Sequence, residues 1–143
     1  MRNESAYKQA YRRTIDGRAK IYLAYLTRRC RLKGHQFDLD LEWVIHRLQI
    51  GRCEVTGIPF DFESRPERNR SPWAFSIDRI DGSKGYTKSN SQAVVWAFNA
   101  AKGEGTDDDV YFLAKCLLGI IPLDERGTIS ALPFNGKVSR SVK

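Results

Sequence analysis

The stretch Ser76–Gly103, "SIDRIDGSKGYTKSNSQAVVWAFNAAKG", decides the fold. Residues 75–80 and 91–95 have the alternation and composition of two short strands, and a helical segment follows the second one. The polar turn between the strands contains two glycines, and the side chain of Asn90 can hydrogen-bond to backbone groups and hold that turn closed. This order of strand, turn, strand and helix predicts an α+β fold.

The residues ahead of this unit predict helices. Residues 5–33 form an amphipathic pattern that "TIDGR" divides into two pieces, and Asp16 is positioned to cap the second piece. Gly34 ends that helix, and "HQFDL" after it predicts a short strand. Asp40 then caps a helix that stops at Gly51.

The remaining segments complete one domain. "CEVTGIPFDFE" at 53–63 predicts a small hairpin, and Thr106 is expected to cap a last helix with an acidic first turn. The rest of the chain has weak patterning and is expected to be irregular. The predicted organisation is a single domain over 1–143, with a basic helical arm (1–33), a core (34–103), and a C-terminal helix and tail (104–143).

The positive charge is concentrated at the N-terminus. The first 33 residues hold ten lysines and arginines against Glu4 and Asp16, a net charge of +8, whereas the rest of the chain holds 14 basic and 15 acidic residues. Such a cluster favours a polyanionic partner, although a solvated helix face is the alternative. The tyrosines at 7, 11, 22 and 25 are expected to pack in the core rather than to stack on bases.

Composition excludes several classes of protein. No apolar run approaches the roughly 18–20 residues of a membrane span, and the N-terminus lacks the apolar segment of a secretory signal, so a cytoplasmic protein without a membrane partner is expected. Cys30, Cys53 and Cys116 form no CxxC pair. We therefore expect neither a disulfide framework nor a structural zinc site.

Three residues of the opening stretch have the chemistry of a metal site. Asp78 ends the first strand and Asn99 lies on the helix that follows the second, so two oxygen ligands face one another. Hard cations such as Mg²⁺ or Mn²⁺ prefer oxygen ligands and keep several waters. Lys102, three residues beyond Asn99, is expected to meet a phosphate. An ordinary hairpin and helix is the alternative for any one of these residues taken alone.

The combination resembles the HNH family of nucleases, also called the ββα-metal or His-Me finger group. "DR" at 78–79, Asn90 and "FN..K" at 98–102 follow that family's order of residues, and "CEVTGIPF" is similar to its CxxC-G hairpin with Thr56 at the second cysteine. The resemblance covers about residues 34–103. It implies a ββα-metal core, one divalent cation held by Asp78 and Asn99, and a structural role for Asn90.

Arg79 occupies the position that the family usually gives to a histidine general base. A guanidinium is effectively never neutral in a protein, so it cannot readily accept a proton from water. Arg79 could clamp a phosphate, could orient water while another group takes the proton, or could leave the base to a different side chain. The PacI-like subset of the family is similar in having arginine here, and it implies His35 and Tyr86 as further catalytic candidates. The alternatives are a polar turn residue at His35 and a packed loop aromatic at Tyr86.

The resemblance implies a metal-dependent DNA endonuclease of phage or mobile-element type that cuts or nicks duplex DNA. A non-catalytic DNA-binding protein on a decayed HNH fold and an RNase are the alternatives. Relatives often dimerise so that two sites meet two strands, which makes a homodimer a further expectation. The candidate DNA-binding residues are arginines of the basic segments, namely Arg12, Arg13, Arg18, Arg28, Arg29, Arg31, Arg65, Arg68 and Arg70.

Overall fold

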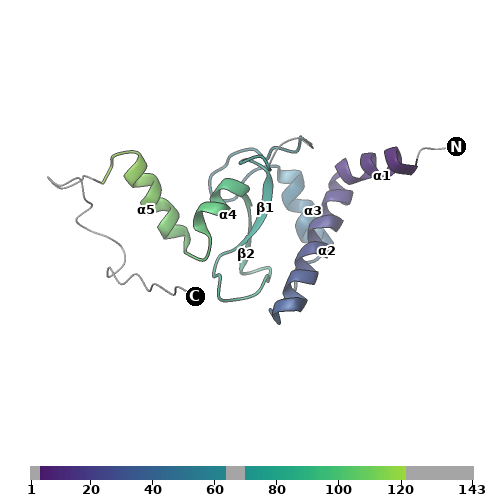
Figure 1. Cartoon of the computed structure of the whole chain (residues 1–143), viewed down its shortest axis with the longest axis horizontal. Coiled ribbons are helices and arrows are strands. Elements are labelled where there is room, and N and C mark those ends of the chain that lie inside the picture. The colour runs from purple at the N-terminus through teal and green to yellow at the C-terminus, as the bar shows by residue number, and fades with distance from the viewer. Residues whose placement is uncertain (1–3, 64–69, 122–143) are drawn as a thin grey trace, which may run out of the picture.

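The computed structural model describes residues 4–63 and 70–121, and over these the fold is α+β, as predicted. The described part contains five helices and a two-stranded antiparallel sheet (Figure 1). In chain order the elements are α1 (Glu4–Arg13), α2 (Ile15–Lys33), α3 (Leu41–Ile50), β1 (Phe75–Arg79), β2 (Ser91–Val95), α4 (Trp96–Lys102) and α5 (Asp107–Leu117). The predicted irregular tail beyond residue 121 lies outside the described residues.

The sheet is a hairpin with a closed turn. β1 and β2 pair from Phe75 opposite Val95 to Arg79 opposite Ser91. Asn90 closes the turn as expected: its Nδ2 donates to the carbonyl oxygens of Asp81 and Gly85, at 3.1 and 2.9 Å, and its Oδ1 accepts from the Asp81 amide at 2.9 Å.

Gly85 lets the turn approach the segment that follows α2. A Cβ atom on Gly85 would lie 1.9 Å from the carbonyl oxygen of Gln36, which no side chain can tolerate. The same approach allows an isolated parallel bridge between Phe37 and Tyr86. The turn of the hairpin is thereby fastened to the chain just beyond the end of α2.

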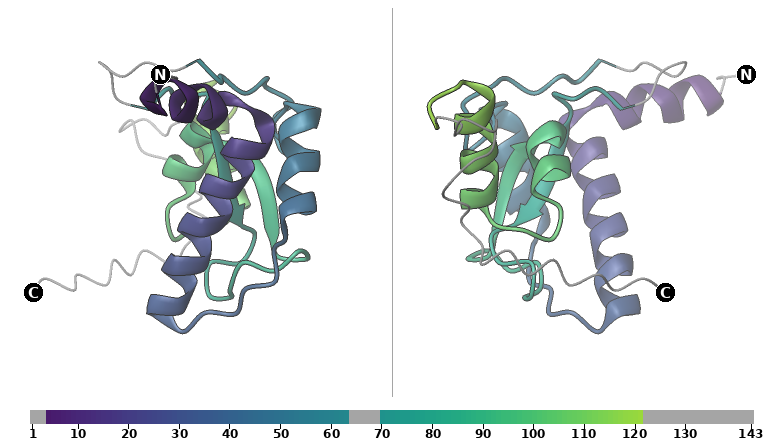
Figure 2. Two further views of the ribbon diagram at one scale, coloured as in Figure 1. Left: turned by 90° about the vertical axis from the view of Figure 1, so that its right-hand side faces the viewer. Right: turned by 60° about the vertical axis from the view of Figure 1, so that its left-hand side comes forward.

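α2 and α3 cover the sheet and share its core. Tyr22 of α2 packs against Phe75 of β1 in a tilted arrangement with ring centroids 4.9 Å apart, and its hydroxyl donates to the Phe75 carbonyl. Leu26 and Cys30 of α2 are buried in the same cluster as Val44 of α3. Figure 2 shows α2 running alongside the hairpin, while α1 turns away from it. Within the described part, α1 contributes no buried residue.

Local signals placed most helix ends correctly. Asp40 caps α3 by accepting from the Trp43 amide, Gly51 ends it in the left-handed conformation, and Thr106 caps α5 with a capping box. The cap of α2 was predicted wrongly. Thr14, rather than Asp16, accepts from the Gly17 amide, because Asp16 already lies in the first helical turn.

Two predicted strand segments are shorter than expected. After Gly34 the chain makes only the isolated bridge at Phe37, and the predicted hairpin at 53–63 is a tight turn closed by a bridge between Arg52 and Pro59. Neither forms a regular strand, because each makes only a single bridge.

The tyrosine prediction holds only for Tyr22. Tyr7 and Tyr11 are exposed because α1 turns away from the core, and Tyr25 of α2 is exposed where it lines a surface hollow. The three cysteines are free thiols, as expected. Among the described residues, no helix is both long enough and apolar enough to span a membrane.

Candidate metal-binding pocket and its supporting network

A pocket of about 580 Å³ lies between α2, β1 and α4. Asp78, Arg79 and Asn99 line it from the hairpin and the helix that follows. Arg29 lines it from α2, and Arg70 lines it from the segment ahead of β1. The structure therefore brings both predicted metal ligands and three arginines to one hollow.

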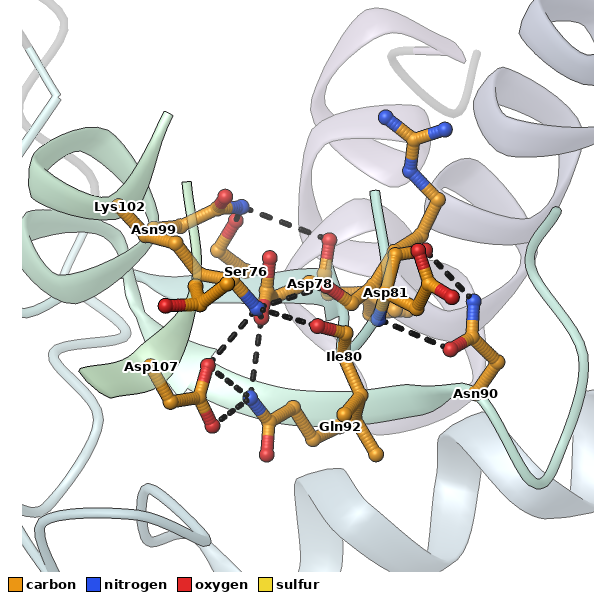
Figure 3. A network of polar contacts seen from close by, with 12 residues as sticks. Ser76, Asp78, Ile80, Asp81, Asn90, Gln92, Asn99, Lys102 and Asp107 are labelled. Atoms are coloured by element: carbon orange, nitrogen blue, oxygen red, sulfur yellow. Dashed lines mark hydrogen bonds and ion pairs between the residues drawn. The ribbon is translucent and has the colours of Figure 1, made fainter. Parts of the chain in front are cut away.

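The buried Asp78 carboxylate is held in place by two hydrogen bonds from side chains. Only 5 % of the residue is exposed, and its Oδ2 accepts hydrogen bonds from Lys102 Nζ at 2.7 Å and Gln92 Nε2 at 3.0 Å. Gln92 stands directly opposite Asp78 in the sheet. In Figure 3, Lys102 and Gln92 meet near this carboxylate, and Asp107 contacts both of them from the other side. One oxygen of Asp78 is thus used by the protein itself.

Lys102 is a buried cation at the centre of this network. Its side chain is 1 % exposed, and its ammonium pairs with Asp78 and, at 2.8 Å, with Asp107. It also donates to the carbonyl oxygens of Arg79 and Ile80. Burial by itself lowers the pKa of Lys102, but the bonds to Asp107 and Asp78 outweigh burial and raise it, so the side chain is charged.

The expected contact between Lys102 and a phosphate does not fit this position. The ammonium is enclosed by two carboxylates and two carbonyls rather than directed into the pocket. Lys102 instead orients Asp78 and ties β1 to the start of α5. The network of Asp78, Asp107 and Lys102 carries a formal charge of −1, which leaves it able to attract a further cation.

The Asn99 side chain turns its amide nitrogen towards β1. Its Nδ2 donates to Ser76 Oγ at 2.7 Å and to the Ile77 carbonyl at 3.5 Å. Because the amide nitrogen faces the strand, the carbonyl oxygen is the end of the side chain that can serve as a ligand.

The donor set fits a hard divalent cation. A carboxylate and an amide oxygen line one pocket. Among the described residues, no group of three or more His, Cys, Asp or Glu side chains is arranged to hold a metal ion, so the candidate site depends on these two oxygens. Two protein oxygens with the remaining positions left to water and phosphate are the usual arrangement for Mg²⁺. Asp78 and Asn99 are the residues that would hold it.

Arg79 connects the pocket to the turn and to His35. Its Nη1 donates to the Lys84 carbonyl at 3.1 Å and lies 3.3 Å from His35 Nδ1. A guanidinium can only donate, so in this contact Nδ1 is the acceptor and the imidazole proton is on Nε2. His35 lines a neighbouring hollow together with Lys84 and Asn90, so its ring approaches the pocket through Arg79.

Tyr86 lies beneath Arg79. The guanidinium carbon lies 5.3 Å from the centroid of the Tyr86 ring, and the residue is buried although it lines the pocket. Burial raises the pKa of the phenol, which keeps it protonated. Tyr86 therefore suits packing and support of Arg79 better than the acceptance of a proton.

The candidate DNA-binding arginines divide into groups. Arg29 and Arg70 line the pocket, while Arg28 and Arg31 line a separate hollow beside Leu41 of α3. Arg12 and Arg13 are exposed on α1. Arg65 and Arg68 lie outside the described residues.

Arg18 has a structural position. Its Nη2 donates to the Phe62 carbonyl at 2.7 Å, and its guanidinium lies over the Phe62 ring. These contacts fasten α2 to the loop ahead of β1 and occupy a side of the guanidinium that a phosphate would need.

Sequence reasoning missed Gln92 and Asp107. Gln92 Nε2 also lies 3.1 Å from Asp107 Oδ2, so the two residues complete the support of Asp78. Only the cross-strand register reveals Gln92, because residues opposite one another in a sheet are not adjacent in sequence. The acidic first turn of α5 signalled a helix start, but not the direction of Asp107.

Comparisons with known proteins add no assignment: no family model, no curated protein and no solved structure matches this chain.

Proposed function

We propose that this protein is a metal-dependent DNA endonuclease with a ββα-metal core formed by β1, β2 and α4. The observation that carries the proposal is the meeting of Asp78, Asn99 and Arg79 in one pocket that also contains Arg29 and Arg70. Oxygen ligands for one cation beside three guanidinium groups suit a phosphodiester, which carries a negative charge and needs charge stabilisation as it is cleaved.

The residues have separate roles in the proposed reaction. A divalent cation, when bound, stabilises charge on the phosphate and on the leaving oxygen. Asp78 and Asn99 would hold that cation, and Lys102 fixes the position of the Asp78 carboxylate. Arg79 binds a phosphate oxygen or orients water, because its guanidinium stays protonated.

His35 supports Arg79 in this proposal and does not act as the general base. The His35→Asn variant is expected to cleave more slowly while its pH–rate profile keeps its shape. An inflection of the wild-type pH–rate profile that vanishes in this variant would instead make His35 the base.

Cleavage of supercoiled plasmid across a series of divalent metals tests the function. Asp78→Asn keeps the size of the side chain and removes its charge, and Asn99→Ala removes the second ligand; both are expected to abolish nicking. Asp108→Asn, at an exposed residue of α5, is the matched control and is expected to cleave normally. Cleavage that persists in excess EDTA or in Asp78→Asn would refute the proposal.

One observation favours a second candidate, a DNA-binding protein without nuclease activity. Asp78 has a structural role in the Lys102 network that requires no metal, so its presence is accounted for without catalysis. This candidate predicts salt-dependent retention of DNA, no cleavage with any divalent metal, and DNA affinity that Asp78→Asn leaves unchanged.

A further inference from the structure

The candidate pocket has an aromatic and apolar wall that phosphate binding does not require. Tyr25 of α2 is 61 % exposed and Trp96 of α4 is 37 % exposed, and both line the pocket. Ile21, also exposed, lies one helical turn before Tyr25 and lines the same hollow. Exposed large apolar side chains that cluster in one hollow rimmed by polar residues mark a site of interaction.

The same pocket contains the cations that a nucleic-acid backbone needs. Arg29 comes from α2 next to the aromatic wall, Arg70 comes from the segment ahead of β1, and Arg79 ends β1. Exposed aromatic rings interleaved with cations form the usual surface for single-stranded nucleic acid, in which bases stack on the rings while phosphates meet the charges.

A regular duplex cannot use the aromatic wall. Its bases are stacked on one another and present only their edges in the grooves, so a ring can stack on a base only where that base has left the helix. The pocket volume of about 580 Å³ is in the range of sites that hold small organic ligands, which leaves room for one nucleotide.

We infer that the substrate of this site is DNA with an unpaired nucleotide next to the scissile phosphate, as in a single strand, a flap or a bulge. The unpaired base stacks on Tyr25 and Trp96, and Arg29 and Arg70 contact the flanking phosphates. This inference rests on the proposed function for the cleavage step, while the binding preference stands on the pocket alone.

Binding in excess EDTA tests the inference without cleavage. The probes are a thymidine strand of roughly 12 nucleotides, within the footprint of single-strand sites, and the same strand paired with its complement. The Trp73→Phe variant keeps two tryptophans, the buried Trp43 and the exposed Trp96. Quenching of its tryptophan fluorescence by DNA therefore reports on Trp96 in the pocket. The single strand is expected to quench Trp96 and to bind more tightly than the duplex.

Substitution of Tyr25 separates stacking from charge. Tyr25→Ala is expected to weaken single-strand binding about 10-fold or more and to leave duplex binding within about twofold, whereas Tyr25→Phe keeps the ring and retains affinity. Tyr111→Ala, at an exposed tyrosine of α5, is the control and is expected to change neither. Because Tyr25 is exposed, its loss leaves the core intact.

Equal losses for single strand and duplex, or no loss in Tyr25→Ala, would overturn the inference. Cleavage assays distinguish this failure from failure of the proposed function. A protein that prefers single strands in EDTA but cuts nothing retains the inferred binding site and loses the nuclease assignment. A protein that cuts duplex and single-stranded DNA equally well, with no effect of Tyr25→Ala, retains the nuclease assignment and loses the inference.

Discussion

Replacement of Lys102 by methionine removes the cation that pairs with a buried carboxylate, Asp78, and with a partly exposed one, Asp107. Methionine keeps an unbranched apolar stem of similar length, so the packing of the side chain is largely preserved. The ammonium, in contrast, pairs with Asp78 and Asp107 and donates to two backbone carbonyls, with only 1 % of the side chain exposed. Its loss leaves buried negative charge without compensation.

The expected cost is large because breaking a buried pair by removing one partner typically destabilises a protein by about 3–5 kcal/mol. For a chain of this size that corresponds to a fall in the melting temperature of about 10 °C or more. Urea and thermal unfolding followed by circular dichroism measure both quantities. Lys88→Met is the matched control: Lys88 also pairs with an aspartate, Asp40, but both side chains are half exposed, so its loss is expected to leave the melting temperature close to that of wild type.

A double variant checks the assignment of the cost. With Lys102 already replaced, Asp107→Asn removes a carboxylate that has lost its partner, so the second substitution is expected to restore stability rather than reduce it further. Two results would contradict a stabilising role of the network: Lys102→Met unfolding at the same urea concentration as Lys88→Met, or additive losses of stability for the substitutions at 102 and 107.

Three further outcomes follow from the turn and the network. Because the pKa of Lys102 is raised above the ordinary lysine value of 10.5, its contribution to stability is complete below that pH and is lost as the pH rises through the folded-state pKa, so urea unfolding of wild type, unlike that of Lys102→Met, is expected to show this alkaline loss. Hydrogen bonds from the Ser83 hydroxyl and amide, with a smaller contribution from the neighbouring lysine, lower the pKa of Asp81 to about 2; Ser83→Ala is expected to raise it towards 3.8 in an NMR titration. The unfolding free energy of Gly85→Ala, measured with urea, is expected to fall by about 1–3 kcal/mol or more. The Cβ of Gly82→Ala would meet nothing closer than 3.9 Å, so the stability of that variant is expected to stay near that of wild type.

The sequence predicted those features that depend on neighbouring residues. The caps at Asp40 and Thr106 and the turn closed by Asn90 follow from local hydrogen bonding, which residue type and spacing reveal. The direction of the Lys102 side chain could not be predicted in this way. Helical spacing places Lys102 near Asn99 but cannot show that Asp107, from the next helix, pairs with its ammonium.

The position of α2 also escaped sequence reasoning, and it changes how the site is understood. The sequence predicted a basic helical arm over 1–33 of a single domain whose core lies at 34–103, and in the structure Leu26 and Cys30 of that arm belong to the same buried cluster as the hairpin. Tyr25 and Arg29, next to Leu26 and Cys30 in sequence, flank this buried stripe and line the pocket with Asp78. The amphipathic pattern of α2 predicts only a core face and a solvent face. In the structure α2 also has a third face, which lines the pocket.

That arrangement explains why only part of the N-terminal charge can serve the site. Arg29 reaches the pocket because it lies on the α2 surface next to the hairpin, whereas Arg28, one residue earlier and about 100° away around the helix, lines the hollow near α3. The distribution of net charge along the sequence shows which helix can face a polyanion, but not which of its residues do. The rotation of the helix about its axis determines which arginines face the pocket. Since the burial of Leu26 and Cys30 fixes that rotation, the core packing of α2 also determines which arginine faces the proposed substrate.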